Sequence, residues 1–502
     1  MQGYVEPCGC TGDPLGDVAR LAGLLQQAKS AHGERVLFVD GGDLLYEKLT
    51  DTAAVDACQH QARTTLLVSA YARAGLAATT RGPLDDVRGR AERDALLAAH
   101  GVPSVEDGAG ITVERGGARV LIVGVDGPDD VPRAQATIAR ERGDVDVVVV
   151  LAQQDMNGAR QTATALVGAD VVVVGKAPEQ PQPPERHGTA TLVVPGWQAQ
   201  HASLVDVVVP ALPRADRTVA IATDSRQADR DARVRLLDVR LKELDALLPT
   251  LEPGHPKTAF QEKRRAQFQV ERDALSSSTF APLVPPYATV RAQPLKRGMA
   301  EEQEAATALR AYERAIPVLV AQCEQGVVCP EPAPGTKAFV GAKTCRACHG
   351  AAYAFWQKAT VTVEKTKPDG TKTTHQSGHV HAMQTLIDGG RDKDRSCVGC
   401  HSAGFDEPGG ACTTTELARR ELGAVQCESC HGPGSLHVQG GGDRAHIVRN
   451  TPEARCRECH VPPHIESASA FVYDERLLHI LGPGHGKARA ESIRAALPNA
   501  KE

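Results

Sequence analysis

Four cysteine pairs in the last third of this chain share one spacing and one following residue. The pattern Cys-x-x-Cys-His occurs at 345–349, 397–401, 427–431 and 456–460. Two thiols three positions apart can add across the two vinyl groups of one porphyrin, and the adjoining imidazole then reaches the iron from one face. The repeat therefore predicts four covalently bound c-type haems. The predicted attachment thiols are Cys345, Cys348, Cys397, Cys400, Cys427, Cys430, Cys456 and Cys459, and the predicted proximal ligands are His349, His401, His431 and His460.

Zinc is the alternative for the same thiols. Two pairs such as Cys397/Cys400 and Cys427/Cys430 can form a tetrahedral thiolate site. A zinc site does not require a histidine directly after each cysteine pair, so the repeat favours haem.

Iron that only transfers electrons needs a second axial ligand, and histidine is abundant in this segment. Methionine is the other common partner, but Met383 is the only methionine beyond residue 337, so at most one haem can be His/Met. We therefore expect mostly bis-histidine iron of low potential. For each spare histidine a surface role is an equal alternative. The spare histidines are His375, His379, His381, His437, His446, His464, His479 and His485.

Composition excludes two classes of partner. The 502 residues carry 57 Lys plus Arg against 62 Asp plus Glu, a net charge of −5, whereas a nucleic-acid-binding surface is strongly basic. The longest apolar run, near 147–152, is too short to span a bilayer. We expect no nucleic-acid partner and no transmembrane segment.

Haem attachment and the remaining cysteines indicate a compartment. Covalent haem attachment normally takes place outside the cytoplasmic membrane, so we expect the periplasm, where disulfides are permitted. The start, Met1–Tyr4, has neither a basic nor an apolar export region, and we expect it to be truncated, processed or misassigned. Cys323 and Cys329 flank a short loop and are expected to bridge. An unpaired structural thiol is an equally good interpretation for Cys58 and Cys412.

Residues 1–212 alternate apolar runs with helical patterns. Runs that are apolar throughout are typical of strands buried on both faces, and the alternation favours a layered α/β domain. The predicted strands are 35–40, 119–125, 146–151, 170–174, 191–194 and 204–209, and the predicted helices are 16–31, 52–74, 84–100 and 158–167.

The middle of the chain, 213–329, reads as a helical connector. Residues 224–275 are helical and highly charged, and the break at 254–256 predicts an antiparallel helical hairpin, either a coiled-coil arm or a plain solvated pair. A strand at 287–292 and a helix at 301–324 follow. The proline-rich stretch 330–338 is expected to be a linker. Residues 339–502 then form a loop-rich, mainly α multihaem domain whose porphyrins serve as its core.

This last segment resembles the tetrahaem cytochrome c that accepts electrons from hydroxylamine oxidoreductase. The similar stretches are 339–344, 377–382, 427–437 and 482–486. The resemblance implies that His379 and His437 are distal ligands, with His485 also a candidate. His381 and His446 are further candidates for distal ligands. The resemblance also implies that one haem iron can lack a strong distal ligand and so have an open coordination position. The insert 361–374 lengthens a loop that is usually short in this family.

The N-terminal part is similar to the metallophosphoesterase domain of bacterial 5′-nucleotidases, through residues 7–10, 15–21 and 39–44. The resemblance places Asp43 at a metal-bridging position. A two-metal site needs several converging Asp, His and Asn ligands. The corresponding stretches read Gly82–Asp85 and Gly175–Pro178, which lack them, so Asp43 is expected to be vestigial and phosphatase activity is not expected.

Cys8 and Cys10 are the remaining residues of this N-terminal part that could carry out redox chemistry. In the resembling branch the first of this pair is sometimes selenocysteine, which implies a redox pair. A structural disulfide or a simple turn is an equal alternative.

Together these features predict a periplasmic multihaem cytochrome that carries electrons between redox partner proteins. One alternative is a haem enzyme that reduces a small nitrogen oxide or a peroxide at one open iron. A second alternative is a haem-coupled phosphoesterase.

Overall fold

The computed structural model describes residues 3–6, 15–47, 54–209, 221–251, 256–281, 284–366, 372–461, 471–482 and 484–496. The chain forms two compact units. The first unit consists of Met1–Pro7, Leu15–Asp51 and Arg63–Leu309, and the second of Cys8–Pro14, Thr52–Ala62 and Arg310–Glu502. The expected connector, 213–329, is therefore divided, because residues up to 309 belong to the first unit and the rest to the second.

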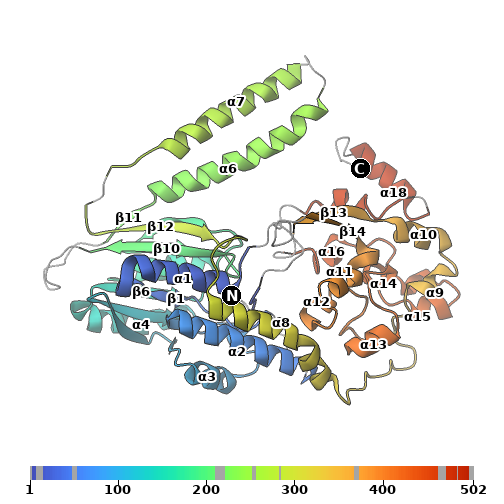
Figure 1. Ribbon diagram of the computed structural model, residues 1–502, viewed down its shortest axis with the longest axis horizontal. Coiled ribbons are helices and arrows are strands. Elements are labelled where there is room, and N and C mark those ends of the chain that lie inside the picture. The colour runs from blue at the N-terminus through green and yellow to red at the C-terminus, as the bar shows by residue number, and fades with distance from the viewer. Residues whose placement is uncertain are drawn as a thin grey trace. The chain divides into compact units, whose positions relative to one another are not determined.

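The first unit is built on a six-stranded sheet with the order β4-β5-β6-β7-β9-β8 (Figure 1). Its inner strands pair in parallel, and β4 and β8 pair antiparallel at the two edges. The strands are β4 Gly110–Arg115, β5 Ala118–Val125, β6 Val147–Ala152, β7 Val171–Val174, β8 Gln182–His187 and β9 Ala190–Val194.

Two three-stranded sheets complete the strands of this unit. One contains β1 Phe38–Asp40, β2 Leu76–Thr80 and β3 Ser104–Val105, and the other contains β10 His201–Val208, β12 Tyr287–Pro294 and β11 Ala222–Asp224. Their side chains share a buried core with one face of the six-stranded sheet. Helices α4 (Val131–Glu141) and α5 (Met156–Ala165) cover the other face.

Strand β6 shows why several strands are apolar throughout. Successive side chains of a strand point to opposite faces. Val148 and Val150 lie in the core beneath the helices, whereas Val147 and Val149 lie in the core between the sheets. Both faces are buried, so the expected layered α/β fold is confirmed.

Two local expectations for this unit were inaccurate. The helix expected over 84–100 begins only at Arg90 (α3, Arg90–Ala99), because Pro83–Asp85 forms a separate 3-10 turn. Strand β2 was missed because its sequence, Leu-Ala-Ala-Thr-Thr, lacks the large residues that mark a buried strand, although every position in it is buried. Helices α1 (Val18–His32) and α2 (Ala57–Ala74) lie close to their expected ranges.

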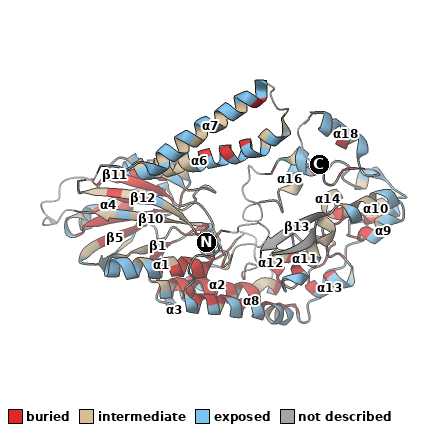
Figure 2. Cartoon of the chain, turned by 45° about the horizontal axis from the view of Figure 1, so that its top comes forward, coloured by how far each residue is buried: buried red, intermediate tan, exposed pale blue. Residues whose placement is uncertain are grey.

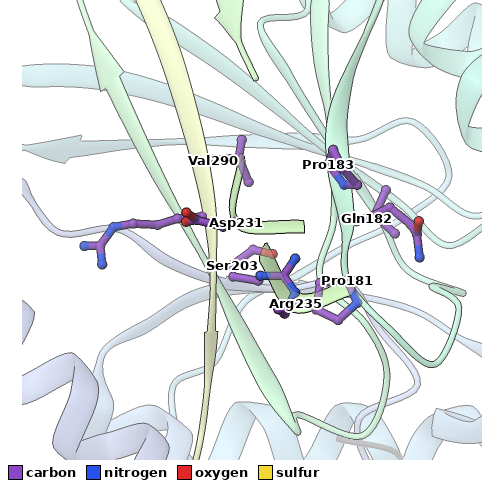
Figure 3. Close-up of a pocket in the computed structure, with 10 residues that line it drawn as sticks. Pro181, Gln182, Pro183, Ser203, Asp231, Arg235 and Val290 are labelled. Carbon is purple, nitrogen blue, oxygen red and sulfur yellow. The ribbon is translucent and has the colours of Figure 1, made fainter. Parts of the chain in front are cut away.

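The predicted helical hairpin is present as α6 (Arg226–Leu247) and α7 (Pro256–Ser277), and much of its surface is exposed (Figure 2). Three ion pairs link the two helices: Arg233–Glu271, Arg265–Asp245 and Arg272–Asp238. Where α6 crosses β8, β10 and β12, a shallow recess is lined by Pro181, Ser203 and Arg235, among others (Figure 3).

The second unit is made of short helices joined by loops. The end of α8 (Gln303–Glu324) contributes to it. The insert expected to lengthen a loop instead forms an antiparallel hairpin, β13 Val361–Thr366 and β14 Lys372–Ser377, because its alternating, threonine-rich sequence suits paired strands. The other helices are α9 Ala342–Arg346, α10 Gly350–Lys358, α11 Ala382–Asp388, α12 Arg395–Val398, α13 Thr414–Arg419, α14 Cys427–His431, α15 Ser435–Gln439, α16 Glu453–Cys456, α17 Tyr473–Leu477 and α18 Lys487–Ala496.

Across the described residues, every helix is too short or too polar to cross a lipid bilayer.

Candidate haem-binding site

Each of the four predicted attachment motifs lies on or beside a short helix. Cys345 is in α9, Cys397 is in α12, the third motif forms α14, and Cys456 ends α16. In the first and fourth motifs the amide of the histidine donates to the carbonyl of the first cysteine, at 2.9 Å. This single helical turn brings the first thiol and the imidazole to one side of the backbone.

All eight predicted attachment thiols are free of disulfide bonds. Cys348 is exposed and the other seven are partly buried. Over the described ranges, no three Cys or His ligand atoms lie within 4.8 Å of one another. The four thiols required by the zinc alternative therefore do not converge.

Three histidine pairs face each other across similar gaps. The ring centres are 6.1 Å apart for His349 and His437, 6.1 Å for His379 and His460, and 6.0 Å for His431 and His485. Two imidazoles on opposite faces of one metal have ring centres about 6 Å apart, because each metal–nitrogen bond is about 2 Å and each nitrogen lies about 1 Å from its ring centre. Each gap therefore has the width that one six-coordinate iron requires. Each pair also joins one motif histidine to one spare histidine.

Backbone carbonyls orient several of these rings. The Nδ1 atoms of His431, His437 and His485 lie within hydrogen-bond distance of the carbonyls of Val448, Asp443 and Ile480. His401 makes the same kind of contact with Ala382, at 2.6 Å. A ring that donates its Nδ1 proton to a carbonyl presents the lone pair of Nε2, which is the form that binds a metal.

Burial favours the neutral form of two of the paired histidines, which is the form that binds iron. Burial, with the charge of His460 added, lowers the pKa of His379 to about 4. Burial also lowers the pKa of His431, and the neighbouring His485 and His349 act in the same direction. These residues fit a haem iron better than they fit a charged surface role.

Thiols from different motifs lie next to one another. A hydrogen bond to Cys427, together with burial, raises the pKa of Cys345, and a hydrogen bond to Cys400, together with burial, raises the pKa of Cys459. Burial, with Cys456 nearby, raises the pKa of Cys430 to about 11. The first motif therefore lies next to the third, and the second motif lies next to the fourth.

The spare histidines divide into paired and unpaired groups. His379, His437 and His485 take part in the three pairs, whereas His381 and His446 are absent from the histidine pairs seen among the described side chains. His446 lies 3.7 Å from the Asp443 carboxylate, and its side chain is 40% exposed. Met383 packs against the core beside Leu386. The side chains of His375 and His464 lie outside the described residues.

Two aromatic residues near these pairs were not expected from the sequence. Phe471 stacks on His460 with ring centres 5.0 Å apart, and Phe355 lies 6.5 Å from His485. Neither belongs to an attachment motif, and only the high aromatic content around Tyr353–Trp356 gave a signal for Phe355.

The expected disulfide pairing is wrong. Cys58 bonds to Cys323, and Cys329 bonds to Cys412, so Cys323 and Cys329 do not bridge and neither Cys58 nor Cys412 is unpaired. Cys323 lies in the last turn of α8, which directs it towards Cys58 at the start of α2. Cys329 lies beyond the helix in extended chain and reaches the haem-motif segment. Cys8 and Cys10 lie outside the described residues.

Asp43 lies among protein groups rather than among metal ligands. Its Oδ1 accepts the Leu84 amide at 2.8 Å, and burial raises the pKa of its carboxyl. A Cβ atom added to Gly82 would overlap both Asp43 and the Gln153 amide, so the two side chains fill this space. Lys176 is the nearby positive charge. This donor set does not fit a two-metal phosphoesterase centre.

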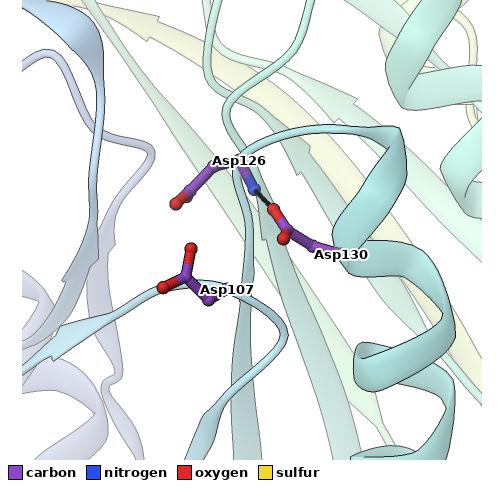
Figure 4. Close-up of side chains that lie close together, drawn as sticks. All are labelled: Asp107, Asp126 and Asp130. Atoms are coloured by element: carbon purple, nitrogen blue, oxygen red, sulfur yellow. Dashed lines mark hydrogen bonds between the residues drawn. The ribbon is translucent and has the colours of Figure 1, made fainter.

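The acidic group of Asp107, Asp126 and Asp130 also lies in the first unit (Figure 4). Asp130 accepts the Asp126 and Gly127 amides at 3.0 Å, which caps the turn at Pro128–Asp130. Asp126 accepts from Thr80 and lies 3.6 Å from Arg81. The carboxylates of Asp126 and Asp130 are thus used by the fold itself.

Three solved structures are similar to this chain at low identity. A sulfate thiohydrolase, SoxB, of Thermus thermophilus is 13% identical with a TM-score of 0.38, and the match covers 63% of this chain and 49% of that one. A 5′-nucleotidase precursor of Thermus thermophilus is 17% identical (TM-score 0.37; 63% and 57% covered). The NAD nucleotidase of Haemophilus influenzae is 10% identical (TM-score 0.40; 68% and 62% covered). The chain spans about half to three fifths of the length of these structures.

The haem-motif segment matches known sequences more closely. The family model described as cytochrome c554 and c-prime matches residues 344–432. Cytochrome c-554 of Nitrosomonas europaea is 32% identical over 178 residues, which cover 28% of this chain and 73% of that protein. The chain therefore belongs to the cytochrome c-554 family, and its C-terminal part is a multihaem c-type cytochrome with covalently bound haem c.

Proposed function

We propose that this protein is a periplasmic electron carrier that passes single electrons between redox partner proteins through four covalently bound haems. The observation that carries this proposal is the set of three histidine pairs about 6 Å apart, each joining a motif histidine to a second histidine. Iron held by two strong ligands is suited to electron transfer, because it has no open position for a substrate.

In this proposal the haem attached at Cys345 and Cys348 is held by His349 and His437. His431 and His485 hold the haem of the third motif, and His460 and His379 hold that of the fourth. His401 is the proximal ligand of the haem attached at Cys397 and Cys400. When bound, each haem supplies one-electron chemistry at its iron, while the protein supplies ligation, spacing and dielectric.

The neighbouring thiols support transfer from haem to haem. Cys345 is hydrogen-bonded to Cys427, and Cys459 is hydrogen-bonded to Cys400. The first and third motifs would therefore hold their haems near one another, and so would the second and fourth motifs.

The two disulfides support a periplasmic location, because disulfides persist in oxidising compartments. The net charge of −5 and the lack of a membrane-crossing helix in the described parts of the chain suit soluble protein partners. Asp43 and its neighbours would act as scaffold, since they lack metal ligands.

Absorption and electron paramagnetic resonance spectra of the ferric and ferrous protein test the proposal. We expect low-spin iron at low potential in the three haems that the histidine pairs hold, and the signals of these three haems should not change on adding nitric oxide, nitrite or peroxide. A high-spin haem that binds and turns over one of these molecules would show that the protein is a haem enzyme rather than an electron carrier. Nucleotide hydrolysis with bound manganese or zinc would favour the phosphoesterase instead.

A further inference from the structure

The three histidine pairs have nearly equal separations but very different angles between their ring planes. The ring centres are 6.0 or 6.1 Å apart in every pair. The angle between the planes is 20° for His349 with His437, 52° for His379 with His460 and 84° for His431 with His485. The first pair is thus close to parallel and the third is close to perpendicular, although both pairs offer the same two ligand types at the same distance.

The backbone fixes the plane of the His431 ring. His431 donates its Nδ1 proton to the Val448 carbonyl at 2.6 Å, and the Val448 amide donates to the His431 carbonyl at 2.9 Å. Val448 therefore holds both the side chain and the main chain of the same histidine. A ring with its Nδ1 proton committed to a fixed carbonyl has little freedom to rotate.

The opposite ring, that of His485, is fixed by a tight turn. Its Nδ1 donates to the Ile480 carbonyl. The His485 amide donates to the Gly482 carbonyl at 2.9 Å, and the Gly482 amide donates to the His485 carbonyl at 2.8 Å. The Phe355 ring packs directly on this turn, because a Cβ atom added to Gly482 would lie 2.2 Å from Phe355 Cε2. Both planes of the third pair are therefore imposed by the chain.

The angle between two axial imidazoles decides how they act on the iron. The filled π orbital of each ring raises the energy of the one iron dπ orbital that lies perpendicular to that ring. Parallel rings raise the same dπ orbital, whereas perpendicular rings raise one each and leave the two orbitals nearly equal in energy. Ligand orientation is thus a means by which the protein tunes the iron, in addition to ligand identity.

This difference has two measurable consequences for ferric low-spin iron. Two nearly equal dπ orbitals preserve orbital angular momentum, which gives one very large g value in electron paramagnetic resonance, whereas parallel rings give an ordinary rhombic spectrum. Parallel rings also raise the orbital that lacks an electron further, which stabilises the ferric state. Turning one ring of a perpendicular pair towards parallel therefore lowers the reduction potential of that haem.

We propose that Val448 and Gly482 are positioning residues that act through His431 and His485 and hold the two ligands of the third-motif haem crosswise. This haem then has an electronic state different from that of the first-motif haem, which His349 and His437 hold nearly parallel. The inference rests on the proposed function, since it requires these pairs to ligate haem. It goes beyond that function because the attachment motifs, which are alike, do not distinguish the two irons.

The first test assigns the signals of the ferric, full-length, matured protein by electron paramagnetic resonance. The wild type is expected to show both a single large-g signal and a rhombic signal. His485→Ala should remove the large-g signal, and His437→Ala should remove the rhombic one. His479→Ala is the matched control, because His479 is an exposed histidine of the same segment as His485, and this variant should keep both signals.

The second test turns a ring without removing it. Gly482→Ala forces the turn and the Phe355 ring apart, and because 84° is close to the maximum of 90°, nearly any turn of His485 brings the planes closer to parallel. The large g value should fall, and the midpoint potential of this signal in a redox titration should fall with it. Gly389→Ala is the control, because its added Cβ would meet no listed atom closer than 3.4 Å and its φ is −90°.

Several results would overturn the proposal. One is a single signal type for all low-spin haems, and another is loss of the rhombic signal, rather than the large-g signal, in His485→Ala. An unchanged large-g signal in Gly482→Ala would show that the turn does not set the angle. A third-motif haem that is high-spin or missing in Gly482→Ala would also count against it, because the turn would then secure ligation rather than the plane. Ferric protein without any low-spin haem would instead refute the proposed function itself.

Discussion

Replacing His437 by alanine removes one ligand from one iron and is expected to change the spin state of that haem alone. His437 lies 6.1 Å from His349, and its Nδ1 is held by the Asp443 carbonyl at 2.8 Å, so no adjustment of the ring is needed for ligation. With the ligand gone, the haem of the first motif becomes five-coordinate or takes up water. The high-spin share of the ferric haem is then expected to rise by about a quarter of the total over the wild-type value, since one of four irons loses its ligand.

The same loop supplies a matched control. His446 lies near Asp443 as well, but its side chain is 40% exposed and takes no part in a histidine pair of the described chain. His446→Ala is therefore expected to leave the spectrum unchanged. Electron paramagnetic resonance of both ferric variants, integrated against total haem, measures the high-spin fraction. A wild-type spectrum for His437→Ala, or an equal high-spin fraction in both variants, would refute the ligand pairing.

Three further predictions concern the protein scaffold. Replacing Cys58 and Cys323 by serine opens a 265-residue loop, which the chain-entropy relation values at about 5.6 kcal/mol. The second unit should therefore unfold at a clearly lower temperature in a calorimetric scan. The Asp85 carboxylate accepts hydrogen bonds from the backbone N–H groups of Asp43, Leu44, Leu45 and Gly82. Asp85→Asn replaces one of its oxygens by an NH2 group, which cannot accept these bonds. The free energy of unfolding of the first unit should therefore fall by about 2 kcal/mol in a urea titration. Burial, helped by Arg235 and Lys296, lowers the pKa of His201 to about 4. In the unfolded protein His201 takes up a proton near pH 6.5, whereas in the folded protein it stays neutral down to about pH 4. The free energy of unfolding should therefore fall by up to about 3 kcal/mol as the pH is lowered from 6.5 to 4. His201→Gln should remove this pH dependence, whereas replacing the exposed His32 by glutamine should not.

The attachment chemistry could be predicted because it is local. Cys345, Cys348 and His349 lie within one turn of chain, and the sequence spacing alone determines that they can serve one porphyrin. The strands of the first unit were predictable for a similar reason, since buried runs such as β6 are apolar on both faces. Strand β2, with its small residues, escaped this pattern. So did the two edge strands β4 and β8, which carry polar residues, and the very short strands β3 and β11.

Tertiary structure decided the rest. The distal histidines could be named as candidates, but nothing in the sequence distinguishes His485, which faces His431, from His446, which lies near Asp443. Disulfide partners were equally hidden, because Cys323 pairs with a cysteine near the start of the chain rather than with its close neighbour Cys329. The contact between Arg395 and Glu324 was hidden for the same reason, since α8, a helix placed in the connector by its sequence, ends beside the second motif.

Each of the four motifs is proposed to carry its own haem. Mass spectrometry of the exported, matured protein is the decisive test, because each attached haem adds about 616 Da. We expect an increment of four haems, with one haem on each of the four motif peptides. A colourless protein with free thiols or bound zinc, or a protein with haem missing from a motif at full maturation, would contradict it.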